Sequence, residues 1–140
     1  MNITIIDGQG GQLGAQLVRE ISAQFPTLEL TAIGTNAVAT AAMLKAGAKK
    51  IATGENPVVV ACRTANVIIG PIGIIIADSL LGEVTEKMAL AVSRANAIRI
   101  LIPLNKCENL VAGVSNLNTG VLIADAVEKV KKIITSTKSS

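Results

Sequence analysis

The chain has 140 residues and a mass of 14.3 kDa, which is the size of one domain. Half of the residues are apolar and 16% are charged, so the chain can bury a full core and global disorder is excluded. It contains no His, Tyr or Trp, which excludes histidine-based catalytic triads, histidine metal sites and tyrosine general acids. The net charge of +3 is scattered and there is a single Phe, so we expect no nucleic-acid binding.

Short apolar segments alternate with longer amphipathic ones. In chain order, the predicted elements are a strand at residues 2–6, a helix at 12–24, a strand at 28–33, a helix at 37–46, a strand at 50–52, a helix at 57–64, a strand at 66–69, a helix at 85–96, a strand at 98–102 and a helix at 118–134. Pro26 ends the first helix, Gly47 ends the second, and Thr85 is the expected N-cap of the fourth.

Three segments are less regular. Residues 74–81 fit either a strand or a buried helix, and Asp78, Ser79 and Gly82 favour the helix. Residues 110–114 are a possible sixth strand, and residues 135–140 are expected to form a frayed tail after a single domain at 1–134.

Strands that are apolar on both faces and alternate with helices predict a mainly parallel sheet covered on both sides. Right-handed crossovers then give an α/β fold, a three-layer αβα sandwich with a Rossmann-like, doubly wound sheet of about five to six strands.

A glycine-rich turn between the first strand and the first helix is the main candidate site. Position 13 is Leu, so GxGxxG fails, but GxxGxxG fits and is similar to the nucleotide loop of extended and atypical short-chain dehydrogenases. Such a loop and the helix N-terminus behind it bind phosphate, although a turn that only packs the helix onto the strand is the alternative. The expected cofactor-binding residues are Gly8, Gln9, Gly10, Gly11, Gln12, Gly14, Thr35, Asn36, Gly70 and Pro71.

Two details of the sequence count against a bound dinucleotide. Asp7 would lie close to a bound pyrophosphate, and the second strand ends without the Asp or Glu that usually accepts the ribose hydroxyls. Thr35 or Asn36 are the expected substitutes. Asp7 is also a candidate Mg²⁺ ligand together with Glu55 or Asp78, although surface and capping roles are more common for such residues and no metal site is assigned.

The loops after the strands carry the remaining polar residues, including 53–56, 70–73 and 103–107. Lys106 favours a reactive Cys107 thiolate, but Glu108 opposes it and no His is present as a base. Cys62 is expected in the core. Without Tyr, the YxxxK pair of short-chain dehydrogenases is impossible, and there is no room for the separate substrate domain of most two-domain dehydrogenases, so a complete, conventional oxidoreductase is not expected.

Several blocks together resemble a family of short, uncharacterised bacterial proteins that are common in clostridia: DGQGG, GTN, MLKAGA, ATGEN, IIGPIGIIIA and IPLNKC. The resemblance spans nearly the whole chain. It implies a Rossmann-like domain of unknown function in a bacterial cytoplasm, and it supplies no catalytic residue.

Three functions remain open, and whether the chain is an enzyme is not decided. The first is a stand-alone nucleotide-binding module, for NAD(P), that serves as a sensor, regulator or accessory subunit. The second is a small enzyme whose site is completed by a second subunit and uses Asp7, Glu55, Asn105 and Lys106, for acid–base or Mg²⁺-dependent chemistry. The third is an interaction protein without a ligand.

The location and assembly follow from the apolar segments. The stretch at residues 67–81 is too short and too interrupted to span a bilayer, and the N-terminus does not resemble a signal peptide, so a cytoplasmic protein is expected. Ile72, the isoleucines at 74–76, Leu80 and Leu81 predict an exposed apolar surface, and hence a homodimer or larger oligomer.

Overall fold

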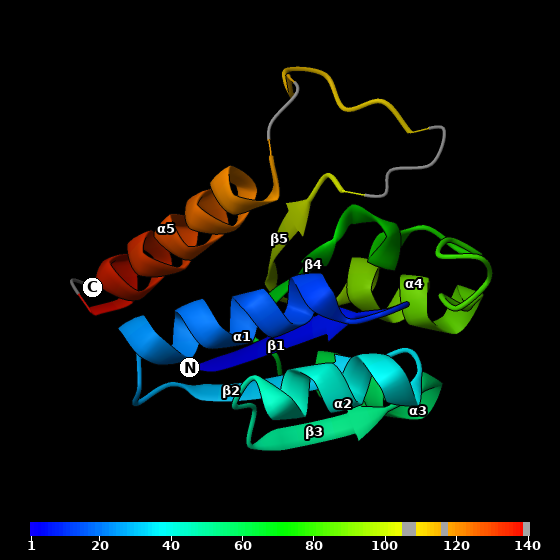
Figure 1. The fold of residues 1–140 in the computed structure, drawn as a ribbon, viewed down its shortest axis with the longest axis horizontal. Coiled ribbons are helices and arrows are strands. Elements are labelled where there is room, and N and C mark those ends of the chain that lie inside the picture. Colours follow the sequence, from blue (N-terminus) through cyan, green and yellow to red (C-terminus); the bar gives the residue numbers. More distant parts are fainter. Residues whose placement is uncertain (105–108, 116–117, 139–140) are drawn as a thin grey trace.

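The computed structural model describes residues 1–104, 109–115 and 118–138, apart from the side chain of Lys138. In this part of the chain the sheet has five parallel strands, which are β1 (Asn2–Asp7), β2 (Glu29–Gly34), β3 (Lys50–Thr53), β4 (Val67–Pro71) and β5 (Ile98–Ile102). They lie in the order β3-β2-β1-β4-β5 (Figure 1). This is the order of the first five strands in a Rossmann sheet, so the predicted α/β fold is confirmed.

Helices cover both faces of the sheet (Figure 1). One face packs against α1 (Gln12–Gln24), α2 (Ala37–Lys45) and α5 (Thr119–Lys138). The other face packs against α3 (Glu55–Cys62) and α4 (Glu86–Arg94). The molecule is therefore the predicted three-layer sandwich.

The central strand β1 is buried on both sides because its side chains alternate between two apolar clusters. Ile3 and Ile5 pack with Leu17 of α1, whereas Ile6 packs with Val58 of α3, and all five side chains are at most 1% exposed. Burial on both faces explains why the strand reads as a nearly continuous apolar run in the sequence.

Three expectations about irregular segments are corrected. Residues 110–114 form no strand, and Leu110 is 94% exposed. After β4 the chain makes a short 3₁₀ helix, η1 (Ile72–Ile75), and then turns, so residues 74–81 are neither a strand nor an α-helix. Helix α5 continues to Lys138, so residues 135–138 are helical where a frayed tail was expected.

Asp7 ends β1 and anchors the start of α1. Its Oδ2 accepts the Gly14 N–H at 2.7 Å and its Oδ1 accepts the Gly8 N–H at 2.8 Å, while the side chain is 5% exposed. The N-cap residue Gly11 has no side chain to cap the helix, so Asp7 does this from the neighbouring strand. Burial raises the pKa of Asp7 above its ordinary value, in spite of the two N–H donors, and the charge of Glu83 adds to the rise.

The 76–84 segment connects η1 to α4 in an unusual backbone conformation. Asp78, Leu80, Leu81 and Gly82 all have positive φ angles, of 66°, 55°, 57° and 88°. Leu80 is buried, whereas Leu81 is 97% exposed. The left-handed conformation costs a non-glycine residue about 1–2 kcal/mol, so the segment holds strain that its contacts must offset.

Replacing Leu81 with Gly should relieve part of this strain without loss of packing. After the entropic cost of glycine, of about 0.5–1 kcal/mol, we expect the free energy of unfolding to rise by about 0.5–1 kcal/mol, measured by thermal or urea unfolding. Leu80→Gly is the matched control, because Leu80 has a similar φ but a side chain only 4% exposed, and it should destabilise the protein by about 2–5 kcal/mol. A loss of stability in Leu81→Gly would contradict the claim that the backbone at Leu81 is strained.

The raised pKa of Asp7 also predicts that the stability of the protein depends on pH. Since its pKa is higher in the folded state, the folded protein binds this proton more tightly than the unfolded chain does. Its contribution to the free energy of unfolding is therefore greatest below the ordinary carboxyl pKa, and declines as the pH rises from there to the raised folded-state pKa. We expect the stability of the wild type relative to Asp7→Asn to decline over that window in urea unfolding at stepped pH. A difference that stays constant, or grows with pH, would count against this assignment.

Candidate functional site

The candidate site lies at the carboxyl ends of β1 and β4. Strand β1 has β2 on one side and β4 on the other, so the chain reverses its direction across the sheet between β1 and β4. Ligands of open parallel sheets bind in the crevice at such a switch point. The glycine-rich turn that follows β1, residues 8–14, is at this place and is called the glycine loop below.

The glycine loop leaves backbone donors without partners. It turns back on itself through the Gly11 N–H, which donates to the Gly8 carbonyl at 3.0 Å, and α1 then begins at Gln12. Within the described part of the chain, the N–H groups of Gly10, Gln12 and Leu13 make no hydrogen bond. They belong to the loop and to the first turn of α1, where the helix dipole also favours a negative charge.

The three glycines of the GxxGxxG spacing are accounted for by packing. A Cβ on Gly11 would lie 2.6 Å from the Ala39 Cα on α2, and one on Gly14 would lie 2.6 Å from the Met43 sulfur. A Cβ on Gly8 would lie 2.6 Å from the Thr35 hydroxyl oxygen. Gly11 and Gly14 therefore let α1 approach β1 and α2 closely, as the packing alternative proposed, and Gly8 leaves room for the residue that follows β2.

Gly10 is different from the other glycines of the loop. A Cβ built on it meets nothing within 4 Å, and its φ is not in the left-handed region. Its lack of a side chain is therefore not required by packing or by backbone conformation. It leaves the space over an unpartnered N–H open, as the approach of a ligand phosphate requires.

Thr35 and Asn36 lie beside the loop, as predicted, and they share a partner that the sequence analysis did not identify. One carboxylate oxygen of Glu83, Oε1, accepts the Gln9 N–H at 2.8 Å, the Thr35 hydroxyl at 2.7 Å and the Asn36 amide at 2.6 Å. Asn36 also donates to the Gln9 carbonyl at 3.0 Å and accepts the Ala39 N–H as the N-cap of α2. The glycine loop, the end of β2 and the 76–84 segment thus meet at one oxygen atom, Oε1 of Glu83.

The Glu83 carboxylate is charged at neutral pH. Partial burial raises its pKa, but the donors on Gln9, Thr35 and Asn36 outweigh burial and hold the pKa below its ordinary value. The second oxygen, Oε2, has no hydrogen bond within the described residues. No local motif in the sequence marks Glu83, because its partners are 47 to 74 residues away along the chain.

Gly70 and Pro71 form the β4 side of the switch point. A Cβ on Gly70 would lie 2.3 Å from the Ile6 carbonyl oxygen, so this glycine allows β4 and β1 to approach each other. Pro71 is the last residue of β4 and is buried. The close approach of β4 to β1 therefore explains Gly70 without a ligand.

The described residues give no support for a metal site, and the one cysteine among them is a core residue. Among the described residues there is no group of three or more His, Cys, Asp and Glu residues that could hold a metal ion, and both Asp7 oxygens already accept backbone N–H groups. Cys62 is buried, which raises the pKa of its thiol, and it belongs to the core as predicted. The expectations for Asn105, Lys106 and Cys107 fall outside the described residues.

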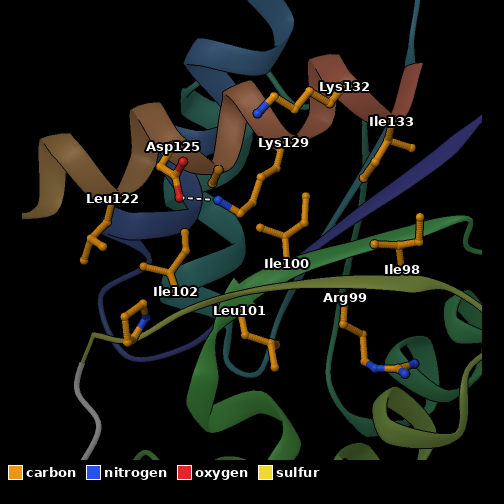
Figure 2. A pocket seen from close by; sticks show the side chains of 12 residues that line it. Ile98, Arg99, Ile100, Leu101, Ile102, Leu122, Asp125, Lys129, Lys132 and Ile133 are labelled. Carbon is orange, nitrogen blue, oxygen red and sulfur yellow. Dashed lines mark hydrogen bonds and ion pairs between the residues drawn. The ribbon is translucent and has the colours of Figure 1, made fainter. Parts of the chain in front are cut away.

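The apolar side chains expected on a surface around residues 72–81 are divided between core and surface, with Ile72, Ile75 and Ile76 half-buried. Ile74 and Leu80 are 1% and 4% exposed, and of this set Leu81 alone is fully exposed. A separate apolar groove of about 370 Å³ runs between β5 and α5, and an ion pair between Lys129 and Asp125 lies along its α5 side (Figure 2). None of its lining residues belongs to the glycine loop. No helix in the described ranges is both long and apolar enough to cross a bilayer.

Comparisons with known proteins place the chain in a family. A search of the curated proteins finds no match. Among solved structures, a dodecameric FMN-dependent UbiX-like decarboxylase from Escherichia coli O157:H7 is similar at a TM-score of 0.44 and 14% identity, over 96% of this chain and 95% of that one. This similarity carries no inference about ligand or assembly. The family model of DUF3842, a domain of unknown function, matches residues 2–135, and the chain therefore belongs to this family.

Proposed function

We propose that the protein is a nucleotide-binding Rossmann-like module whose ligand is NAD(P), and that it acts as a sensor, regulator or accessory subunit. The observation that carries this proposal is the set of unpartnered N–H groups on Gly10, Gln12 and Leu13 at the β1–β4 switch point. Three donors on a loop and on the adjoining helix N-terminus match the chemistry of a diphosphate, which offers several anionic acceptors.

Asp7, the main objection to a bound pyrophosphate, has a structural role. Its two carboxylate oxygens are directed to the Gly8 and Gly14 N–H groups, and the side chain is buried beneath the loop. Both Asp7 oxygens hold backbone N–H groups of the loop and of α1, a structural role that supports a binding site over the enzyme alternative.

Binding is tested by thermal shift and calorimetry with NAD, NADP, ATP and FMN, each with and without Mg²⁺. A ligand at 100 times its dissociation constant should stabilise the wild type by about 2.7 kcal/mol. Gly10→Val should keep the fold, because space is open at this position, and should weaken binding at least about tenfold by blocking the approach of phosphate.

Gly120→Val is the matched control for this variant. Gly120 is exposed in the first turn of α5, and its nearest neighbour would be an ordinary contact at 3.4 Å. This variant should bind like the wild type. Gly11→Val is unsuitable, since its side chain would collide with the α2 backbone. If no nucleotide stabilises the wild type, or if Gly10→Val binds as the wild type does, the proposal fails.

We also propose that the protein is a homo-oligomer, with β5 at the contact. Strand β5 is at an edge of the described sheet, Ile98 on it is 52% exposed, and the apolar groove lies beside it (Figure 2). Open strand edges and apolar grooves are surfaces that proteins usually cover.

Light scattering at micromolar concentration should therefore give a dimer or larger species. Ile98→Glu, which places a charge at the edge strand, should shift the population to monomer by weakening association at least about tenfold. Val38→Glu is the control, at a side chain 66% exposed on α2, and should leave the assembly unchanged. A monomeric wild type would exclude this proposal.

A further inference from the structure

The acid that a Rossmann site uses to recognise ribose is missing from the end of β2, and the structure supplies a carboxylate there from elsewhere. We propose that Glu83 is the ribose-recognising residue of the nucleotide site, and that it selects ligands with free 2′- and 3′-hydroxyls over ligands with a 2′-phosphate. This inference rests on the proposed function and deepens it, because it distinguishes NAD from NADP.

The position of Glu83 supports the assignment. In dinucleotide-binding sheets the ribose lies between the glycine loop and the end of β2, where an Asp or Glu accepts its 2′-hydroxyl. Here the residues that follow β2 are Thr35 and Asn36, and both donate to the Glu83 carboxylate, as does the loop residue Gln9. The carboxylate is thus held between the same two elements, although it comes from the connection between β4 and α4.

The free oxygen of Glu83 also supports the assignment of this residue to ribose recognition. Oε1 takes all three donors, while Oε2 has no hydrogen bond within the described residues. A charged carboxylate oxygen without a donor is a strong acceptor for a hydroxyl, and the three bonds to Oε1 fix its orientation in advance. A 2′-phosphate is mostly doubly charged at neutral pH, so it is a poor donor to the carboxylate and adds like charge, and it is therefore disfavoured.

The 76–84 segment holds this carboxylate in place. Leu80 is buried above Gly8, with its Cδ1 2.8 Å from where a Gly8 Cβ would lie, and Ser79 donates to the Gly73 carbonyl. Positive φ angles at Asp78, Leu80 and Leu81 turn the chain so that Glu83 reaches the loop. The strained backbone of the segment therefore lies next to the carboxylate that the proposed ribose contact requires in a fixed position.

The test is calorimetric titration of NAD and NADP into the wild type, Glu83→Gln and Glu86→Gln. The wild type should bind NAD about tenfold or more tightly than NADP. Glu83→Gln keeps a carbonyl oxygen for the three donors but removes the charge, so the preference for NAD should fall at least about fivefold, mainly through tighter binding of NADP. Glu86→Gln makes the same change at an exposed residue on α4 and should leave the preference unchanged.

A second measurement needs no variant and is independent of folding. The wild type should bind ADP about tenfold more tightly than 2′-deoxy-ADP, because the deoxy ligand lacks the hydroxyl that donates to Glu83. Equal affinities for these two ligands would overturn the inference.

The outcomes separate this inference from the proposed function. Equal wild-type affinities for NAD and NADP, or a preference that Glu83→Gln does not change, would reject the role of Glu83. In that case, nucleotide binding that is weakened by Gly10→Val would still support the proposed nucleotide site. An equal gain in affinity for NAD and NADP in Glu83→Gln would also reject the role of Glu83 in ribose recognition. It would mean that the wild-type carboxylate occupies the place of a phosphate that both ligands share. If the wild type binds neither nucleotide, the proposed function itself fails.

Discussion

The close approach of α1 to β1 and α2 is the constraint on which the candidate site depends. Gly11 and Gly14 have no room for a methyl group, because the α2 backbone and the Met43 and Asp7 side chains lie against them. This packing fixes the axis of α1 and therefore the direction of its first N–H groups. Asp7 satisfies one of these groups, at Gly14, and those of Gln12 and Leu13 remain unpartnered at the switch point.

Two carboxylates lie on either side of Gly8 and have opposite properties. Asp7 is buried beneath the loop with a raised pKa, whereas Glu83 lies beside the loop with a lowered one. They are coupled, since the charge of Glu83 contributes to the rise at Asp7. The environment separates their roles, with Asp7 holding the helix in place and Glu83 presenting a charged oxygen to a ligand.

Most of the fold could be predicted from local patterns. All five strands appear where apolar runs predicted them, and Thr85 is the N-cap of α4 as its position indicated. The prediction was wrong at residues 110–114, where apolar residues do not pair with a neighbouring strand, and in the 76–84 segment. There, non-glycine residues adopt positive φ angles because tertiary contacts hold them, and propensity does not indicate this.

The sequence by itself determined the parallel sheet, the helix that follows the glycine loop and the place of the loop at the first strand end, because apolar periodicity and glycine spacing are local properties. The tertiary structure decided which glycines serve packing and which one leaves open space, since this depends on α2 and β1 rather than on spacing. It also decided that a carboxylate lies beside Thr35 and Asn36. Glu83 reaches them only because the chain crosses from β4 to the end of β2, and a contact between residues so far apart in the chain leaves no periodic signal in the sequence.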